Sequence, residues 1–360
     1  MAKLGDIATY INGYPFKPND WSDTGLPIIR IQDLTGNSYQ ANRYKGEYQP
    51  KYEVNAGDVL ISWSASLGVY IWQGEKALLN QHIFKVVFNK EAVSKDFFVF
   101  QVEQILKKAA QDVHGATMKH LTKPVFDALP FYLPSYEEQC NIANKLKYVR
   151  SIIEQRQEQL TKLDELVKAR FVEMFGDCRL NPKGWVTKNL DQVADVGSSK
   201  RVFVEELQSE GIPFYRGTEV GALAEGKSIR PELFITEGHY KQLCEATGKP
   251  QKGDLLMPSI CPDGRIWVVD TDAPFYFKDG RVLWVHLTSQ NYNPVFLLYT
   301  LKDRIMTDYE SIASGTTFAE LKIFALKKCR IFDVPLSLQN QFADFVAEVD
   351  KSKLLAELFA

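Results

Sequence analysis

The chain has 360 residues, 45% of them hydrophobic and 24% charged, as expected of a globular protein long enough for two or three domains. Its 43 lysines and arginines are balanced by 45 aspartates and glutamates, and this charge of −2 argues against a nonspecific polyanion binder. The chain has no signal-like start, no apolar run of about 18 residues and no C-x-x-C pair among five scattered cysteines, which disfavours a membrane span, a zinc site and a disulfide framework and predicts a cytoplasmic location.

Residues 1–134 predict a first domain with many short strands. Apolar runs of strand length occur at 27–31, 59–61 and 83–88, each bounded by Gly, Asp or Asn. A helix is predicted over 95–110, where apolar residues recur at helical spacing and Asp96 stands near the start. The first domain is therefore expected to mix helices with sheet.

Residues 135–176 predict one long helix, because no glycine or proline occurs between 135 and 175 and Gly176 provides a stop. At about 40 residues it would be roughly 60 Å long. Such a helix cannot bury a single apolar stripe on itself, so the stripe predicts a coiled coil with a partner helix, or else a helix lying on a domain surface. With only Arg156 interrupting, the stripe follows a 4-3-4 spacing through Ile142, Leu146, Val149, Ile153, Leu160, Leu163 and Val167.

Residues 177–335 predict a second mixed domain, entered through the turn-rich string NPKG at 181–184 and containing a strand at 266–269. A shorter closing helix is predicted over 336–360. Its apolar residues Phe342, Val346 and Val349 give it an apolar stripe of its own, which would suit a partner for the long helix.

The two domains read as copies of one plan. The offset between matched segments grows from 186 to 196 to 200, so the second copy is expected to carry extra loop residues. Five pairs of segments recur in the same order: LGDIA at 4–8 and LDQVA at 190–194, GLPIIR at 25–30 and GIPFYR at 211–216, GDVLI at 57–61 and GDLLM at 253–257, GAT at 115–117 and GTT at 315–317, LP at 133–134 and VP at 334–335.

No catalytic residue and no metal ligand are predicted. The string Asn293-Pro294-Val295-Phe296 resembles a methyltransferase element but lacks its second proline and an upstream glycine-rich loop, so it is interpreted as a turn that starts a helix. Glu320 and Lys322 with Asp308 form a partial nuclease pattern that the first copy does not repeat. None of the five histidines stands in a nucleophile motif, and no P-loop occurs.

The order domain, long helix, domain, helix resembles the specificity subunit of type I restriction–modification enzymes. The resemblance covers the whole chain and is carried by the strings GLPIIRIQDL at 25–34, GDVLIS at 57–62, LPSYEEQ at 133–139, LDELVKARFVEMFGD at 163–177 and NPKGW at 181–185. It implies an α+β fold in which two repeated target-recognition domains are joined by long helices that pair as an antiparallel coiled coil. The closing helix departs from the pattern, because it has about half the length of the central one.

The resemblance also implies a function and partners. Each domain would read one half of a split site on double-stranded DNA, and the helices would set the gap and dock two modification subunits. A restriction and translocation subunit would join through the complex. S-adenosylmethionine, ATP and magnesium would belong to those partner subunits, and this chain would bind no cofactor.

Base reading needs paired donors and acceptors, and phosphate contacts need cations, hydroxyls or free N–H groups. Such groups occur at matched positions near strand ends and in a strand-like run between Tyr276 and Trp284. Arg30 and Arg216 are equally open to a structural interpretation, because they occupy the same position in both copies. The full candidate set is Arg30, Gln32, Ser64, Lys119, His120, Arg216, Thr218, Ser259, Arg265, Lys278, Arg281, Thr316 and Thr317. Two other functions stay open: a protein–protein scaffold without DNA binding, and a stand-alone methyltransferase or nuclease.

Overall fold

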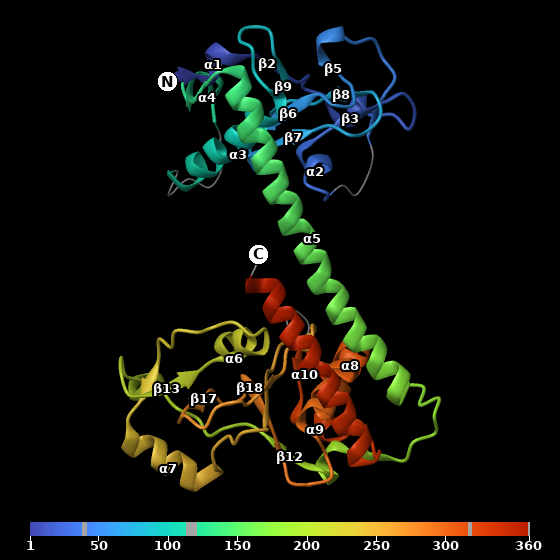
Figure 1. Cartoon of the computed structure of the whole chain (residues 1–360), viewed down its shortest axis with the longest axis vertical. Helices are drawn as coiled ribbons and strands as arrows, with labels where there is room; N and C mark the ends of the chain where they lie inside the picture. Colours follow the sequence, from blue (N-terminus) through green and yellow to red (C-terminus); the bar gives the residue numbers. More distant parts are fainter. Residues whose placement is uncertain (38–41, 113–120, 316–318, 359–360) are drawn as a thin grey trace. The chain divides into compact units, whose positions relative to one another are not determined.

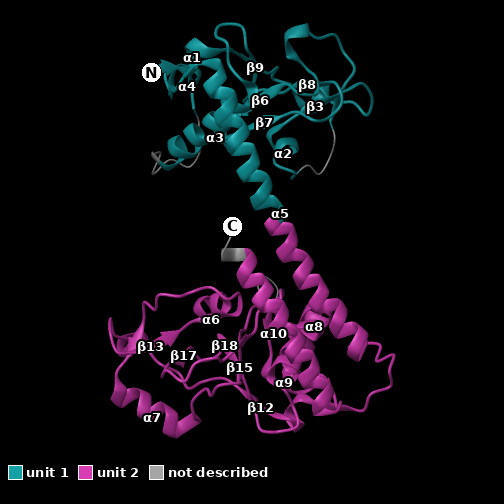
Figure 2. Cartoon of the chain, viewed as in Figure 1, with its two compact units in different colours: residues 1–155 teal, residues 156–360 magenta. Residues whose placement is uncertain are grey.

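The structure is a computed structural model that describes residues 1–37, 42–112, 121–315 and 319–358. The chain forms two compact units, residues 1–155 and 156–360 (Figure 2). The boundary falls inside the long helix, which the division predicted from sequence had treated as a segment of its own. Each unit is an α+β fold, as predicted.

The first unit contains two four-stranded sheets, and the sheet that carries most of its core has the order β2-β9-β6-β7 (Figure 1). The second sheet has the order β4-β3-β8-β5 and contains one parallel pair, β3 with β8. The strands are β1 Ala2–Lys3, β2 Thr9–Asn12, β3 Leu26–Ile29, β4 Arg43–Tyr44, β5 Glu53–Val54, β6 Val59–Ser62, β7 Gly68–Ile71, β8 Ala77–Leu79, β9 Ile83–Val87 and β10 Pro130–Phe131. The helices are α1 Leu4–Ile7, α2 Ile31–Leu34, α3 Lys95–Asp112 and α4 Lys123–Asp127, before the long α5 Tyr136–Phe175.

The second unit repeats this plan with β12-β18-β15-β16 as the matching sheet and a parallel pair of β13 with β17. Its strands are β11 Thr187–Asn189, β12 Ala194–Gly197, β13 Ile212–Tyr215, β14 Phe234–Ile235, β15 Leu255–Pro258, β16 Trp267–Val268, β17 Tyr276–Phe277, β18 Val282–Leu287, β19 Ala313–Ser314, β20 Glu320–Leu321 and β21 Arg330–Phe332. Its helices are α6 Gly217–Ala224, α7 Glu237–Thr247, α8 Pro294–Ile312, α9 Ile323–Lys327 and α10 Leu336–Leu358.

Identical hydrogen bonds at matched positions confirm the repeat. The Gly-Asp turns explain one shared motif: Asp58 Oδ2 accepts the Asn55 N–H at 2.8 Å, and Asp254 Oδ2 accepts the Gln251 N–H at 2.8 Å. The glycine before each aspartate has a φ near +90°, which a side chain would strain. The extra residues of the second copy are not only loop, because they include α7, a helix of 11 residues.

A buried glutamine in the first turn of α5, and another in the first turn of α10, bonds the helix to the strand-rich part of its own unit. Gln339 is fully buried; its side-chain Nε2 donates to the carbonyls of Asn291 and Val334 at 3.0 and 2.9 Å, and its Oε1 accepts from the Asn293 N–H at 2.8 Å. Gln139 makes the same three kinds of bond in the first unit. We call this arrangement the glutamine clamp. Since it recurs, it supplies a residue-by-residue correspondence between the units.

Replacing Gln339 by alanine is expected to lower the free energy of unfolding of the second unit by about 3 kcal/mol, because three backbone groups at a fully buried side chain lose their hydrogen-bond partner, at about 1 kcal/mol each. Urea unfolding followed by tryptophan fluorescence would measure the loss. Gln139→Ala should act equally on the first unit, and the exposed Gln242→Ala is the control. A loss no larger for Gln339→Ala than for Gln242→Ala would contradict the clamp.

The predicted long central helix is confirmed, and α10 runs antiparallel along its C-terminal part within the second unit (Figure 1). Phe342 packs against Phe171 at 5.4 Å between ring centroids, and Lys353 reaches Asp164 at 2.7 Å. Residues farther along α10 thus meet residues earlier in α5. Of the predicted packing residues, Leu163, Val167, Phe342, Val346 and Val349 belong to the core of the second unit, and Leu160 is half-buried.

The predicted seam is not continuous in this chain. Ile142 packs against the core of the first unit instead of a partner helix. Leu146, Val149 and Ile153 are 41%, 51% and 50% exposed. The prediction that these four residues pack against the closing helix of the same chain was wrong. The heptad pattern shows which face of a helix is apolar but not what covers that face.

Candidate nucleic-acid interface

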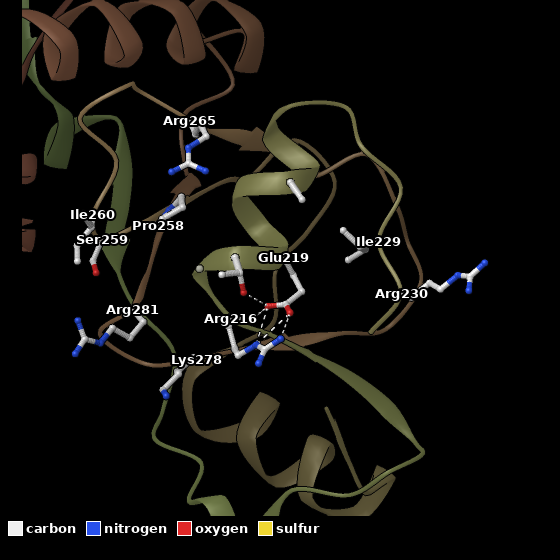
Figure 3. A pocket seen from close by; sticks show the side chains of 13 residues that line it. Arg216, Glu219, Ile229, Arg230, Pro258, Ser259, Ile260, Arg265, Lys278 and Arg281 are labelled. Carbon is white, nitrogen blue, oxygen red and sulfur yellow. Dashed lines mark hydrogen bonds and ion pairs between the residues drawn. The ribbon is translucent and has the colours of Figure 1, made fainter. Parts of the chain in front are cut away.

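Six of the predicted DNA-contacting residues line one cavity in the second unit, with a volume of about 680 Å³. They come from separate segments: the start of α6, the end of β15, the loop before β16 and the turn between β17 and β18 (Figure 3). We call this the α6 cavity. Its predicted members are Arg216, Thr218, Ser259, Arg265, Lys278 and Arg281.

Arg216 is held by carboxylates. Its Nε lies 3.1 Å from Glu219 Oε1, and a terminal nitrogen lies 3.0 Å from Glu232 Oε2. Glu219 also accepts the Arg216 backbone N–H, which fixes the first turn of α6. Although burial alone would raise it, the hydrogen bonds from Arg216 and Thr218 hold the pKa of Glu219 at about 2. The structural interpretation of Arg216 is therefore favoured over a role as a free DNA contact.

The other cations of the α6 cavity differ in how far they are engaged. Arg265 pairs with Asp263 at 2.8 Å, and Arg281 pairs with Glu320 while staying 57% exposed. Lys278 is exposed and forms no ion pair with the residues that the structure describes. The same holds for Arg230, a lining residue that sequence reasoning missed and that points away from Arg216 and Glu219 in Figure 3. Its position in the loop after α6, close to Lys227, was the available signal.

In the first unit, Arg30 occupies the place of Arg216. Its backbone N–H donates to Asp33 Oδ2 at 2.7 Å, and its guanidinium lies 5.7 Å from the centre of the Trp21 ring. Gln32 follows on α2, whereas Ser64 lies in the loop between β6 and β7. The predicted strand over 27–31 extended two residues too far, because β3 ends at Ile29 and Ile31 begins α2.

The correspondence between units also pairs His82 with Arg281. The Trp63 N–H donates to the His82 carbonyl at 3.2 Å, and the Ser259 N–H donates to the Arg281 carbonyl at 2.9 Å. The His82 ring lies 4.9 Å from Trp63, centroid to centroid. His82 was missed as a candidate, because no local sequence match aligns it with Arg281.

The two predicted serines have buried side chains. Ser64 and Ser259 are 5% and 2% exposed, which argues against a direct DNA contact by either side chain. Lys119, His120, Thr316 and Thr317 lie outside the described residues. Leu121, the first described residue after His120, donates its backbone N–H to the Trp63 carbonyl. In the second unit the Leu321 N–H donates to the Ser259 carbonyl in the same way.

The residues considered for catalysis have other partners. Asn293 caps α8 by accepting the Val295 N–H at 2.9 Å, as its interpretation as a helix start predicted. Asp308 pairs with Arg304 at 2.9 Å, and Glu320 pairs with Arg281. In the described ranges no three or more His, Cys, Asp or Glu side chains group so as to hold a metal ion. Over those same ranges no helix is both long and apolar enough to span a membrane.

A family model for the type I restriction modification DNA specificity domain matches residues 1–162 and 182–358. The chain belongs to this family. The two matches coincide with the two repeats, and each match includes one long helix or a large part of it.

Individual relatives agree with this assignment to the specificity-domain family. The chain is 27% identical to the type I restriction enzyme EcoBI specificity subunit of Escherichia coli, over 97% of this chain and 78% of that protein. It is 23% identical to the MjaVIII specificity subunit of Methanocaldococcus jannaschii, over 97% and 85%. The S subunit of a type I restriction–modification system from M. genitalium shares the fold, with a TM-score of 0.54 at 14% identity over 99% of this chain and 90% of that one.

Proposed function

We propose that this chain recognises a two-part DNA site, with each unit reading one half in the major groove. The observation that carries the proposal is the α6 cavity, where residues from four separate segments, several of them cations, line one site on a framework that the first unit repeats. The exposed Lys278 and Arg281 supply donors for base edges or phosphates. Because the side chains at matched positions differ, the two halves of the target should differ in sequence.

In this proposal the chain is non-catalytic and acts through partners. Two modification subunits would bring S-adenosylmethionine, and a restriction and translocation subunit would bring ATP and magnesium. The names of the relatives support this division, since they are specificity subunits of restriction enzymes. A cytoplasmic location is proposed with it, because the partners and the DNA are there.

The experiment that tests the function combines the chain with modification subunits of its own system. Methyl transfer from S-adenosylmethionine to genomic DNA would be mapped by sequencing. We expect methylation only with both components present, at a motif made of two short sequences separated by a fixed gap. Methyl transfer by the chain alone, or a single uninterrupted motif, would show that the proposal is wrong. If methylation were retained although this chain does not bind DNA, the protein–protein scaffold would be favoured.

The exposed part of the α5 stripe is the proposed docking surface for a modification subunit. Leu146, Val149 and Ile153 are about half exposed at heptad spacing, so a helix from another subunit can cover them. Val149→Glu with Ile153→Glu is expected to weaken binding of the modification subunit at least tenfold, measured by calorimetry or pull-down. Val204→Glu, at an 80% exposed apolar residue elsewhere, is the control. Equal binding by both variants would contradict this docking surface.

A further inference from the structure

A second cationic cavity lies in the second unit and shares no lining residue with the α6 cavity. It has a volume of about 370 Å³ and is lined from the turn after α5, from β11, from α8 and from the start of β21. We call it the α8 cavity. Its charged members are four cations and one carboxylate: Arg179, Arg304, Lys328, Arg330 and Asp308.

The carboxylates near the α8 cavity offset only part of the positive charge of its four cations. Asp308 pairs with Arg304 at 2.9 Å and more distantly with Arg179 at 3.7 Å. Lys328 and Arg330 are exposed and have no ion pair within the described ranges. The Nε atom of Arg304 is buried and has no hydrogen-bond partner in the described part of the chain. The cavity therefore keeps donors that an anion could satisfy.

Two further carboxylates stand close by, and each has a hydrogen-bonding or contact partner of its own. Asp177 Oδ1 accepts the backbone N–H groups of Leu180 and Arg179 at 2.8 Å each, and these bonds, with the nearby charges of Arg179 and Arg304, lower the pKa of Asp177. Asp303 lies beside the Cys178 thiol, whose pKa is raised by burial and then by that carboxylate. Neither carboxylate belongs to the cavity lining.

The first unit builds the same framework without these charges. Through the glutamine clamp, Arg304 corresponds to Ile105 and Asp308 to Ala109. The Leu4 N–H bonds the Leu129 carbonyl as the Leu190 N–H bonds the Cys329 carbonyl, both at 2.9 Å. The residues flanking Cys329, Lys328 and Arg330, therefore correspond to the uncharged Ala128 and Pro130. The fold does not require the cluster, so the cluster needs another explanation.

The α8 cavity is also separate from the α6 cavity. Lys302 and Met306 on α8 approach Gly264, beside Arg265 of the α6 cavity. Arg304 lies two residues from each of them in the sequence, so its side chain leaves the helix about 200° around the axis from theirs. The two groups of residues therefore leave α8 on different sides, and a ligand of the α8 cavity would not be the base pair read in the α6 cavity.

We propose that the α8 cavity binds a phosphate group. Guanidinium groups present paired donors that match phosphate oxygens, and a lysine and the Thr187 hydroxyl add single donors. A phosphate carries enough charge to engage several cations at once. The group can come from free phosphate or from the DNA backbone outside the recognised bases, and both sources satisfy the same donors.

The test compares the full-length chain with Lys328→Ala/Arg330→Ala, in which Lys328→Ala restores the residue of the first unit. Both side chains are exposed, so folding should be retained, as circular dichroism would check. Inorganic phosphate is titrated by calorimetry at constant ionic strength. We expect saturable binding by the natural chain, at least tenfold weaker binding by the variant, and no change in Lys241→Ala/Lys252→Ala, two exposed lysines elsewhere in the unit.

A second arm measures the salt dependence of binding to a nonspecific duplex. If the source is the DNA backbone, the variant should flatten the slope of log affinity against log salt by about 2, because each phosphate contact contributes roughly 0.9. Weaker phosphate binding with an unchanged slope supports a site for free phosphate. A flattened slope supports a site for the DNA backbone. Unchanged phosphate binding together with an unchanged slope overturns the proposal. The phosphate arm needs no DNA, so its result stands apart from the proposed recognition function.

Discussion

Lys278→Ala combined with Arg281→Ala is expected to weaken binding to the cognate DNA by at least about 30-fold. Both cations line the α6 cavity, and each lost base contact costs about 1–3 kcal/mol, so two contacts give about 2 kcal/mol or more. Fluorescence anisotropy with a duplex that carries the methylated motif would measure the change. The variant Lys241→Ala/Lys252→Ala removes the same charge from exposed positions outside the cavity and should bind normally.

The position of the loss along the DNA is the sharper readout. Selection from a randomised library should show that the double variant relaxes the bases of one half-site and leaves the other half unchanged. His82→Asn should do the converse, because His82 corresponds to Arg281 in the first unit and asparagine tolerates its φ of 73°. Equal losses for every sequence would assign Lys278 and Arg281 to phosphates. A change in both halves from either variant would contradict the two-reader proposal.

A heptad inserted just before Arg156 is expected to widen the preferred gap between half-sites by about three base pairs. Seven helical residues add roughly 10 Å, and one base pair occupies roughly 3.4 Å. The insertion leaves the contact between Lys353 and Asp164 in place, because that contact lies on the C-terminal side of Arg156. Since seven residues make almost two full turns, the following unit is rotated by only about 20°.

Selection of bound DNA from a library with randomised gap lengths would measure the effect. An insertion of five residues is the matched control. It rotates the following unit by about 140°, so simultaneous binding of both halves should be lost while each half alone still binds. An unchanged gap with full affinity for the heptad variant would show that the helix is not the spacer.

The repeat and the long helix could be predicted from sequence because each depends on short-range chemistry. A Gly-Asp pair needs only its own turn, and a segment without glycine or proline reads directly as a helix. The helix α7 was not predicted, because the offset between copies counts extra residues without stating their conformation. The sequence predicts which residues form the apolar stripe on α5. It does not predict which parts of the stripe are buried, because burial depends on tertiary contacts that no local pattern specifies.

The candidate site was predictable as a set of positions and not as a set of roles. Matched strand ends, together with a charged run between Tyr276 and Trp284, led to six residues that share a cavity. Arg216 is engaged by Glu219, three residues along, and by Glu232, 16 residues away, and the second contact requires the tertiary fold. The burial of Ser64 and Ser259 has the same origin, since both follow strands whose ends are enclosed by later segments. Exposure therefore had to come from the structure.

The glutamine clamp bears on how such a protein can change over generations. Each clamp contacts only backbone atoms, at Ala92 and Pro134 or at Asn291 and Val334 in addition to one N–H, so it places no demand on the side chains it meets. A recombination event could join a recognition domain from another gene to the long helix that begins at the clamp, and all three hydrogen bonds would be kept. A chain could thus acquire a new half-site specificity by exchange of a whole domain, while the long helices and the subunits that dock on them stay unaltered.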